Sequence, residues 1–210
     1  MERAETVEER RGEKREEKRG EILAAAVRVL ARDGIAETTT RKIALEAGVN
    51  QAMLRYYFGS KDELLFAVLQ EMMRQTREIA QAAASTQGDI RAAIAESLKA
   101  FWKHVEAAPE LQVMQYELTL YALRTPDAAW LAKQQYEGYR AVVEALLQEA
   151  FAAAQQTAAL PFAALARFII AGLDGLILQF ISDRDPERAR KDLDHLIAAT
   201  SALVEGRELQ

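Results

Sequence analysis

The sequence predicts an all-α protein of about nine helices. Apolar residues recur at intervals of three and four positions almost throughout, which is the spacing of a buried helical stripe. No stretch shows the strict alternation of apolar and polar residues that marks a strand between hairpin turns. With 210 residues, of which 50% are hydrophobic, the chain can bury a core as one domain or two small ones.

The helices can be placed from their apolar stripes and from the breaks between them. The first amphipathic helix carries a stripe from Ile22 to Leu30 and ends at Asp33-Gly34, because glycine favours a helix end. Two short helices follow at 40–47 and 51–58, and longer ones near 61–85, 89–107, 110–123, 127–155, 161–182 and 186–205. Proline cannot continue a helix interior but fits the first turn of the next helix. The breaks are Thr86-Gln87-Gly88, Pro109, Thr125-Pro126-Asp127, Pro161 and Ser182 to Pro186.

The composition excludes several classes of protein. The chain has no cysteine, which rules out disulfides, thiolate metal sites and cysteine nucleophiles and fits a reducing cytoplasm. The first residues are charged, with no apolar core for a signal peptide. The most apolar run, Phe162 to Ile181, is interrupted by Arg167 and Asp174 and falls short of an uninterrupted membrane span. We therefore expect a cytoplasmic protein with no membrane partner.

The sequence also disfavours an enzyme. It carries no glycine-rich phosphate loop, no Gly-x-Ser-x-Gly elbow and no His-Glu-x-x-His pair. The two histidines, His104 and His195, fall on different predicted helices, which disfavours a histidine-rich metal centre. We expect no catalytic residues, no cofactor and no metal.

Charge is divided unevenly along an acidic chain. The formal net charge is −5. Residues 38–61 hold four cations and one anion, a net of +3, whereas the residues from 66 onward hold 14 cations and 19 anions, a net of −5. Charge on the contacting face, and not the total, decides whether a polyanion binds. This division suits a small nucleic-acid-binding domain joined to a larger acidic body.

Residues 1–20 form a charged tail with seven basic and seven acidic residues. On a helix the two signs separate, because Arg11, Lys14, Arg15, Lys18 and Arg19 share one arc and the glutamates lie opposite. Like charges at i,i+4 weaken an isolated helix, so we expect this tail to be frayed or disordered without a partner. Two interpretations stay open: a cationic stripe that settles on phosphates, or a solvated tail.

The segment 38–61 has the local signals of two helices joined by a tight turn. Thr39 or Thr40 can cap the first helix. Gly48 supplies the left-handed conformation that ends it, and Asn50 can cap the second.

The apolar positions of this segment give each helix one buried face. Ile43 faces the core, the small Ala44 permits close packing, and Val49 packs inward from the turn. Leu54 and Phe58 are spaced i,i+4 and form the buried face of the second helix. A helix, a short turn containing glycine and a second helix make the helix-turn-helix motif, whose second helix enters the major groove of DNA.

The residues left on the outward face suit base recognition. Gln51 can bind adenine and Arg55 guanine in bidentate fashion, and Ala52 can contact a thymine methyl group. Side chains suited to phosphate contact, which fixes the register without reading sequence, lie close by. They are Thr40, Tyr56, Tyr57 and Lys61. Spacing alone leaves the alternative of ordinary core packing, with Tyr56, Tyr57 and Phe58 as a hydrophobic cluster.

Residues 21–65 resemble the N-terminal domain of the TetR-type transcriptional repressors. The resemblance rests on the opening amphipathic helix, on Gly34 and the threonines before the motif, and on the junction Phe-Gly-Ser-Lys-Asp-Glu-Leu at 58–64. It implies that the base-reading positions are Arg41, Gln51, Ala52 and Arg55, and that Thr40, Tyr56, Tyr57 and Lys61 contact phosphates. Arg55 stands where many members have tyrosine, and Tyr57 where many have histidine, which puts the operator sequence in doubt.

The resemblance also implies a second domain, residues 66–210, for effector binding and dimerisation. The run Phe168 to Phe180 is apolar nearly all round, so this helix is buried on more than one side. Followed by the last helix, it resembles the two helices through which such regulators pair as a four-helix bundle. The expected interface residues are Phe168, Gly172, Gly175, Leu176, Leu193, Leu196 and Ile197.

The family implies an effector pocket between these ends. Pockets mix aromatic walls with a few polar anchors. The candidates are Phe101, Trp102, His104, Met114, Tyr116, Glu117, Tyr121, Trp130, Gln134 and Tyr136. The implied function is that of a homodimeric repressor that releases double-stranded operator DNA when a small molecule binds. The alternatives are a regulator of the same fold controlled by a protein partner or by DNA alone, and a helical enzyme or scaffold that uses the motif otherwise.

Overall fold

A computed structural model of the chain describes residues 7–83 and 89–206. Over these residues every regular element is helical, which confirms the predicted all-α class. The elements are α1 (Val7–Glu37), α2 (Thr40–Glu46), α3 (Gln51–Phe58), α4 (Lys61–Ala83), α5 (Ile90–Ala107), α6 (Pro109–Arg124), the short 3₁₀ helix η1 (Pro126–Ala128), α7 (Ala129–Ala154), α8 (Phe162–Asp183) and α9 (Pro186–Val204). The bounds of the described ends from α2 onward agree with those predicted to within about two residues, which is the usual scatter of helix ends. The predicted end at residue 85 and the predicted break at Thr86-Gln87-Gly88 lie outside the described residues.

Helix α1 differs from the expectation at its beginning. It is helical from Val7, whereas the charge pattern indicates a frayed or disordered tail over residues 1–20; residues 1–6 lie outside the described part. The segment extends a helix already anchored by the buried stripe from Ile22, so it needs no costly nucleus of its own. The predicted end at Gly34 is confirmed as a break, because Gly34 leaves the helical region with φ 73° and ψ 169°.

The chain forms two compact units, and the division between them falls within α4, α6 and α7. The N-terminal unit comprises the described residues up to Leu69 together with Met114–Leu131. The C-terminal unit comprises Gln70–Val113 and the described residues from Ala132. This grouping differs from a single division after residue 65, because most of α6 and the beginning of α7 belong to the N-terminal unit.

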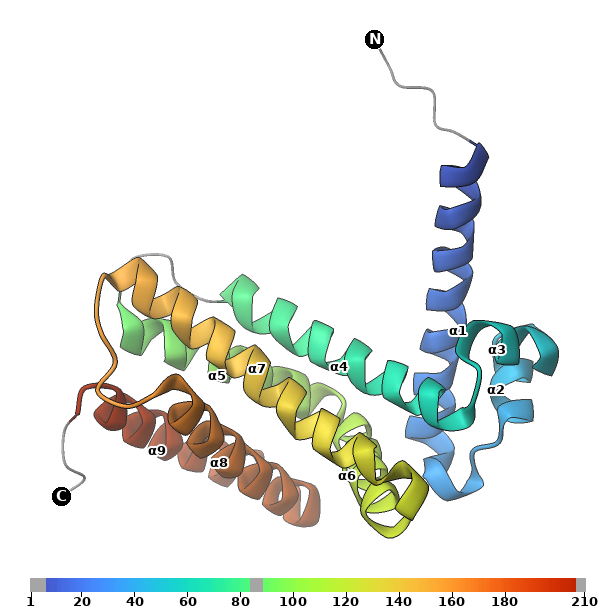
Figure 1. Ribbon diagram of the computed structural model, residues 1–210. Helices are drawn as coiled ribbons and strands as arrows, with labels where there is room; N and C mark the ends of the chain where they lie inside the picture. The colour runs from blue at the N-terminus through green and yellow to red at the C-terminus, as the bar shows by residue number, and fades with distance from the viewer. Residues whose placement is uncertain (1–6, 84–88, 207–210) are drawn as a thin grey trace. The chain divides into compact units, whose positions relative to one another are not determined.

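The core of the N-terminal unit is built from one face of each of its helices. Helix α2 packs against α1 and α3, and Figure 1 shows α2 and α3 beside the C-terminal half of α1. Ile22 and Leu30 of α1, Ile43 of α2 and Leu64 of α4 are almost fully buried. Burial of these side chains holds the short helices α2 and α3, which are too short to be stable alone.

In the C-terminal unit, α8 and α9 run side by side and α9 also packs against α5 (Figure 1). Trp102 of α5 is 2% exposed, and its ring centroid lies 5.8 Å from that of Phe180 in α8. Gly172 of α8 allows close approach of α9, because a Cβ atom there would collide with Leu196.

Helix α8 is long and apolar enough to cross a membrane by length and composition, with a mean hydropathy of 1.8. The sequence predicts that Arg167 and Asp174 make this helix too polar for a membrane span. By length and mean hydropathy that expectation is wrong, because the apolar residues outweigh the two charges. Within the structure, 33% of its most apolar window is buried. A helix at the core or interface of a water-soluble protein has the same composition.

Candidate DNA-binding surface

Two side-chain caps and one glycine form the turn between α2 and α3. The Thr39 hydroxyl accepts a hydrogen bond of 3.2 Å from Lys42 N, and the Asn50 carboxamide oxygen accepts one of 2.8 Å from Met53 N. Gly48 has φ 63°, a left-handed conformation that costs a non-glycine residue energy. Val49 N donates to Ala44 O at 2.9 Å, which closes the turn. The predicted roles of Gly48 and Asn50 are confirmed, and Thr39 is the cap of α2.

Helix α3 is divided into a buried and an exposed face, as its spacing predicts. Leu54 and Phe58 are buried. On the other side lie Gln51, Ala52, Arg55 and Tyr56, all exposed. Tyr56 is 68% exposed, so the alternative of a buried cluster of three aromatic residues is not supported.

Three of the four side chains expected to contact phosphates are more enclosed than the base-reading ones. Arg41 is exposed, whereas Thr40, Tyr57 and Lys61 are half-buried. Tyr57 packs edge-on against Tyr56, with ring centroids 5.3 Å apart. Tyr56 is thus the exposed member of the four expected phosphate contacts, and it packs against the half-buried Tyr57.

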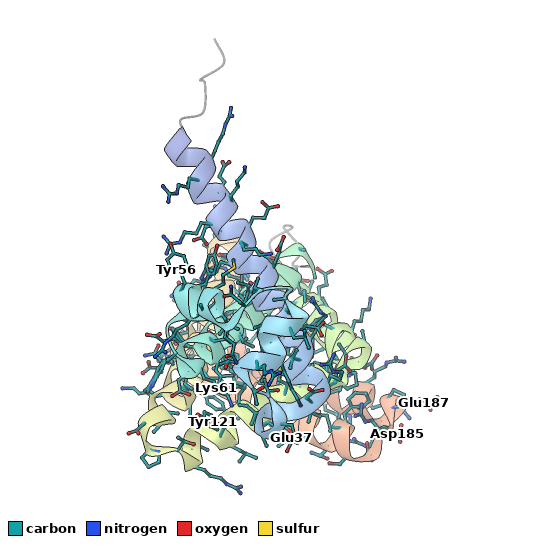
Figure 2. The ribbon with its side chains drawn as sticks, turned by 90° about the vertical axis from the view of Figure 1, so that its right-hand side faces the viewer. Glu37, Tyr56, Lys61, Tyr121, Asp185 and Glu187 are labelled. Atoms are coloured by element: carbon teal, nitrogen blue, oxygen red, sulfur yellow. The ribbon has the colours of Figure 1, made fainter. Side chains whose placement is uncertain are left out.

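Lys61 is the first residue of α4, and its side chain contacts residues of the N-terminal unit. Its Nζ donates to Thr38 O at 3.0 Å and lies 5.9 Å from the ring centroid of Tyr121 (Figure 2). Tyr121 of α6 in turn donates to Asp62 Oδ1 at 2.9 Å. Burial, reinforced by the Asp62 carboxylate, raises the pKa of Tyr121, so this phenol stays protonated as a donor.

A cluster of ion pairs joins α1 to α2 and neutralises the one anion of the 38–61 segment. Glu46 pairs with Arg28 at 3.0 Å and with Arg32 at 3.3 Å. Asp33 pairs with Arg32 at 2.8 Å and with Lys42 at 3.1 Å. Hydrogen bonds from Arg28 and then Arg32 lower the pKa of Glu46, and hydrogen bonds from Arg32 and then Lys42 lower that of Asp33. Arg41 and Arg55 take no part in the pairs of this cluster.

The structure reveals contacts that the sequence did not predict. Glu117 of α6 accepts a hydrogen bond of 2.8 Å from Ile35 N, and its carboxylate lies against Gly34 at the break in α1. The guanidinium of Arg15 lies 5.5 Å from the ring centroid of Tyr56, and that of Arg19 lies 5.1 Å from Phe58. The charge arc on α1 was visible in the sequence, but nothing there linked it to α3.

The expected effector-pocket residues are divided between the two units. Met114, Tyr116, Glu117, Tyr121 and Trp130 belong to the N-terminal unit, and Phe101, Trp102, His104, Gln134 and Tyr136 to the C-terminal unit. Several already have partners within their unit. Trp130 packs edge-on against Phe66 at 5.2 Å between ring centroids, and Trp102 Nε1 donates to Glu106 at 3.0 Å.

A tyrosine of α7 in the C-terminal unit has a raised pKa. Tyr136 donates to Asp174 Oδ2 of α8 at 3.0 Å. Burial, followed by the charge and hydrogen bond of Asp174, raises the pKa of Tyr136 to about 12. The pair crosses from one helix to the other and places a carboxylate within the apolar run of α8.

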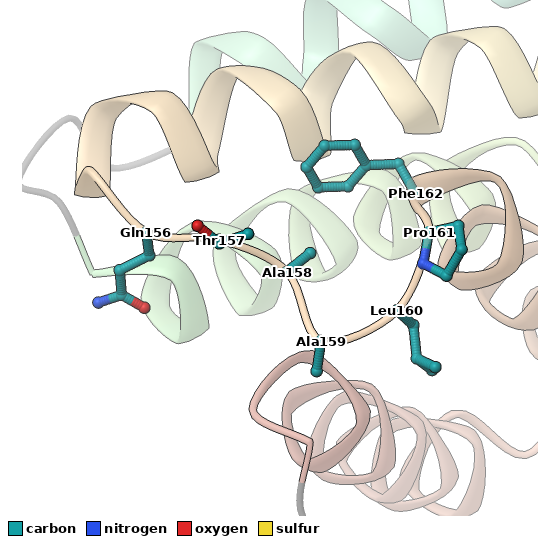
Figure 3. A pocket seen from close by; sticks show the side chains of 7 residues that line it. All are labelled: Gln156, Thr157, Ala158, Ala159, Leu160, Pro161 and Phe162. Carbon is teal, nitrogen blue, oxygen red and sulfur yellow. The ribbon is translucent and has the colours of Figure 1, made fainter.

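A pocket of about 510 Å³ opens beside the α7–α8 loop (Figure 3). It is lined by residues 156–162, none of which is among the expected effector contacts. Among the residues that the structure describes, no group of three or more metal-ligating side chains comes together.

The residues expected at a dimer interface are partly exposed. Phe168, Gly172, Gly175, Leu176 and Ile197 are half-buried within one subunit, whereas Leu193 and Leu196 are buried in it. Leu178 of α8, which the sequence analysis did not single out, is 49% exposed. Helix α8 therefore leaves apolar side chains partly exposed in one subunit. Leu193 and Leu196 of α9 are instead buried inside the subunit.

The architecture of the N-terminal unit defines a helix-turn-helix DNA-binding protein. Residues 22–68 match the family model of bacterial regulatory proteins of the tetR family, and residues 89–200 match the tetracyclin repressor-like C-terminal domain. The chain belongs to the TetR family and is a DNA-binding transcriptional regulator.

Known proteins are similar over most of the chain. The HTH-type nicotine-responsive transcriptional repressor HdnoR of Paenarthrobacter nicotinovorans is 30% identical over 184 residues, which are 87% of this chain and 93% of that protein. The crystal structure of the multidrug binding protein EbrR complexed with ethidium is 29% identical, with a TM-score of 0.62 over 85% of this chain and 98% of that one. FadR of Bacillus subtilis in complex with stearoyl-CoA shares the fold at 22% identity, with a TM-score of 0.65 over 90% and 98% of the two chains.

The lowered pKa values of Asp33 and Glu46 predict that acid destabilises the N-terminal unit. Both carboxylates bind protons more weakly when folded, so their contribution is present above their ordinary pKa, near about 4, and is lost as the pH falls through the folded values. The double variant Asp33→Asn/Glu46→Gln should have a lower thermal midpoint at pH 7 and a flatter decline in acid. The measurement is thermal unfolding by circular dichroism between about pH 7 and 3.

The control is Glu110→Gln, which removes an exposed carboxylate of α6 outside the cluster. It should leave the pH profile unchanged. A double variant with the slope of the unsubstituted protein would show that the cluster contributes nothing.

Proposed function

We propose that this regulator is a homodimeric repressor that reads its operator with α3 and releases it when a small molecule binds in the C-terminal unit. The observation that carries the proposal is the exposed face of α3, where Gln51 and Arg55 stand free of the core behind a turn fixed by Gly48. The protein is expected to act in the cytoplasm and to be no enzyme, as suits a family of transcriptional regulators.

Each exposed side chain of the motif has a role that follows from its chemistry. Arg55 offers two parallel donors to the O6 and N7 atoms of guanine, and Gln51 a donor and an acceptor to adenine. Ala52 contacts a thymine methyl group, and Arg41 approaches the bases from α2. The rim of Thr40, Tyr56, Tyr57 and Lys61 binds phosphates and fixes the register.

Arg55 is the residue whose loss should change sequence preference. Arg55→Ala should weaken binding to the operator by about 1–3 kcal/mol and leave binding to random duplex nearly unchanged, because base contacts carry the discrimination. The measurement is fluorescence anisotropy with DNA from upstream of the gene and with a shuffled duplex, at two salt concentrations.

Arg77→Ala is the matched control, because Arg77 is an exposed arginine of α4 that pairs with Glu149 at 3.2 Å. It should bind both duplexes as the unsubstituted protein does. Equal weakening of Arg55→Ala on both duplexes would contradict base reading. Failure of the unsubstituted protein to prefer any duplex, even at low salt, would overturn the proposed function.

The dimer is supported by the apolar surface that α8 leaves uncovered in one subunit. Two copies paired through α8 and α9 would bury that surface about a two-fold axis. The same axis would present two α3 helices to half-sites one or more helical turns apart.

Leu178→Glu tests this pairing. A charge at a half-exposed leucine of α8 should cost little in one subunit but strongly disfavour an apolar interface. We expect the variant to shift toward the monomer and to lose operator affinity, as measured by light scattering after size-exclusion chromatography and by anisotropy. Leu123→Glu, at a 68% exposed position of α6, is the control and should stay dimeric. A monomeric unsubstituted protein that binds its operator fully would contradict the proposal.

Several polar groups in the C-terminal unit support an effector site there. Gln112 is 2% exposed, and its Oε1 atom has no hydrogen-bond partner. A buried carbonyl oxygen without a donor is costly and is readily satisfied by a ligand. His104, Gln134 and Tyr136 are the polar candidates of the same unit, with Phe101 and Trp102 as apolar ones.

Helix α6 gives a route from that unit to the DNA-binding helices. It begins in the C-terminal unit and carries Glu117 and Tyr121, which hold Ile35 N and Asp62 in the N-terminal unit. A ligand that favours one placement of α6 would therefore shift the population of α3 orientations.

Nicotine and ethidium are suitable first probes, because the similar proteins are a nicotine-responsive repressor and a multidrug binding protein complexed with ethidium. At a hundredfold excess over Kd, a bound effector should raise the free energy of unfolding by about 2.7 kcal/mol and so raise the thermal midpoint. It should also weaken operator binding. Thermal shift and anisotropy measure the two effects. A compound that stabilises the protein but leaves operator affinity unchanged would favour control by a protein partner or by DNA alone.

A further inference from the structure

We propose that the N-terminal extension of α1 is a second DNA-contacting element. Its basic stripe, which is formed by Arg11, Lys14, Arg15, Lys18 and Arg19, would bind duplex phosphates next to the site that α3 reads. This inference rests on the proposed DNA binding by α3, and the experiment below separates the two.

The five basic residues lie within helix α1 and share one face of it. Arg11, Lys14 and Arg15 are exposed, and Lys18 and Arg19 are half-buried. At about 100° per residue they fall within one arc of the helix. Glu13, Glu16 and Glu17 are exposed on the opposite side. Residues 1–20 carry no net charge, so separation of the signs, and not their number, gives this face its positive potential.

Two stacking contacts join the basic stripe to α3. Arg15 lies over the ring of Tyr56 at 5.5 Å, and Arg19 lies over the ring of Phe58 at 5.1 Å. Tyr56 is an exposed residue of the proposed phosphate rim, and Figure 2 shows it beside α1. In Figure 1 the first turns of α1 extend past α3. The stripe therefore continues the proposed DNA-binding surface and does not begin a separate one.

The cations at the outer end of the stripe are available to a ligand. Within the described part of the chain, Arg11, Lys14 and Arg15 form no ion pair, whereas Lys18 pairs with Glu21 at 2.7 Å. From Arg11 to Arg19 the helix rises about 12 Å. A duplex carries one phosphate charge per roughly 1.7 Å of its axis, so this length faces several phosphates.

The composition of the extension also points to a polyanion. The extension contains pairs of like charges spaced i,i+4, namely Arg11 with Arg15 and Lys14 with Lys18. Such pairs weaken a helix unless an anion lies beside them. Gly12 and Gly20 weaken it further, and a Cβ atom at either position would meet nothing within 4 Å. Such a helix has much to gain from a phosphate backbone, since binding relieves the repulsion that opposes it.

The test compares full-length Arg11→Gln/Lys14→Gln with the matched variant Glu13→Gln/Glu17→Gln, which neutralises the opposite face. The affinities of both for operator and for random duplex are measured by anisotropy over a salt series. Circular dichroism confirms that the helix content is retained.

We expect the basic-face variant to bind both duplexes more weakly and to the same extent. Its slope of log K against log salt should fall in magnitude by about 2 per subunit, since each phosphate contact contributes about 0.9. Between about 50 and about 200 mM salt the unsubstituted protein should lose roughly twelvefold more affinity per subunit than the variant. The acidic-face variant should keep the original slope.

A second variant strengthens the helix without changing its charge. Gly12→Ala/Gly20→Ala should raise the helix content and tighten binding to both duplexes by roughly two- to fivefold, because a better-formed extension loses less entropy on binding.

The outcomes separate the inference from the proposed function. If the unsubstituted protein prefers its operator but the basic-face variant keeps its affinity and salt slope, the stripe is a solvated face and this inference is wrong. A loss confined to the operator would also overturn it, because phosphate contacts weaken all sequences alike. If the unsubstituted protein binds no duplex at low salt, the proposed function itself fails.

Discussion

The structure of the N-terminal unit depends on one tight turn. Gly48 in its left-handed conformation, with Asn50 capping the helix that follows, fixes the angle at which α3 leaves α2. That angle decides which side of α3 meets Ile43 and which side meets solvent. A side chain at Gly48 would have room but the wrong backbone conformation, so the limit is conformational and not steric. The exposed face of α3 is thus determined by residues that lie outside that face.

The local position of charged residues, and not the net charge of the chain, determines the electrostatics of the helix-turn-helix segment. The chain as a whole is acidic, yet Glu46, the one carboxylate between residues 38 and 61, is held by Arg28 and Arg32 of α1. These pairs are exposed and weak as stabilising contacts. They also neutralise the one carboxylate of the segment that carries Arg41 and Arg55. An acidic body joined to such a surface limits binding to polyanions elsewhere on the molecule.

Local features of the helices could be predicted from the sequence because they depend on residues that are close in the chain. The Asn50 cap, the turn at Gly48 and the two faces of α3 depend on residues within about four positions, and these were predicted. The contact from Glu117 to Ile35 N joins residues 82 positions apart, and no periodicity carries such information. The same limit applies to the expected effector contacts, which the sequence grouped by residue type and the structure divides between two units. The start of α1 was misjudged because the charge rule describes an isolated helix, whereas this segment extends an anchored one.

The contact between Glu117 and Ile35 N has a consequence for how the chain tolerates changes in length. Tyr121, one turn further along α6, binds Asp62, so a residue inserted between Glu117 and Tyr121 would turn one side chain about 100° around the helix axis relative to the other, and the two contacts could not both be kept. A deletion would turn it the other way. Most substitutions on the outer side of α6 leave that geometry alone. The stretch of α6 from Glu117 to Tyr121 therefore accepts only one length, which makes it a poor place for tags or grafted loops.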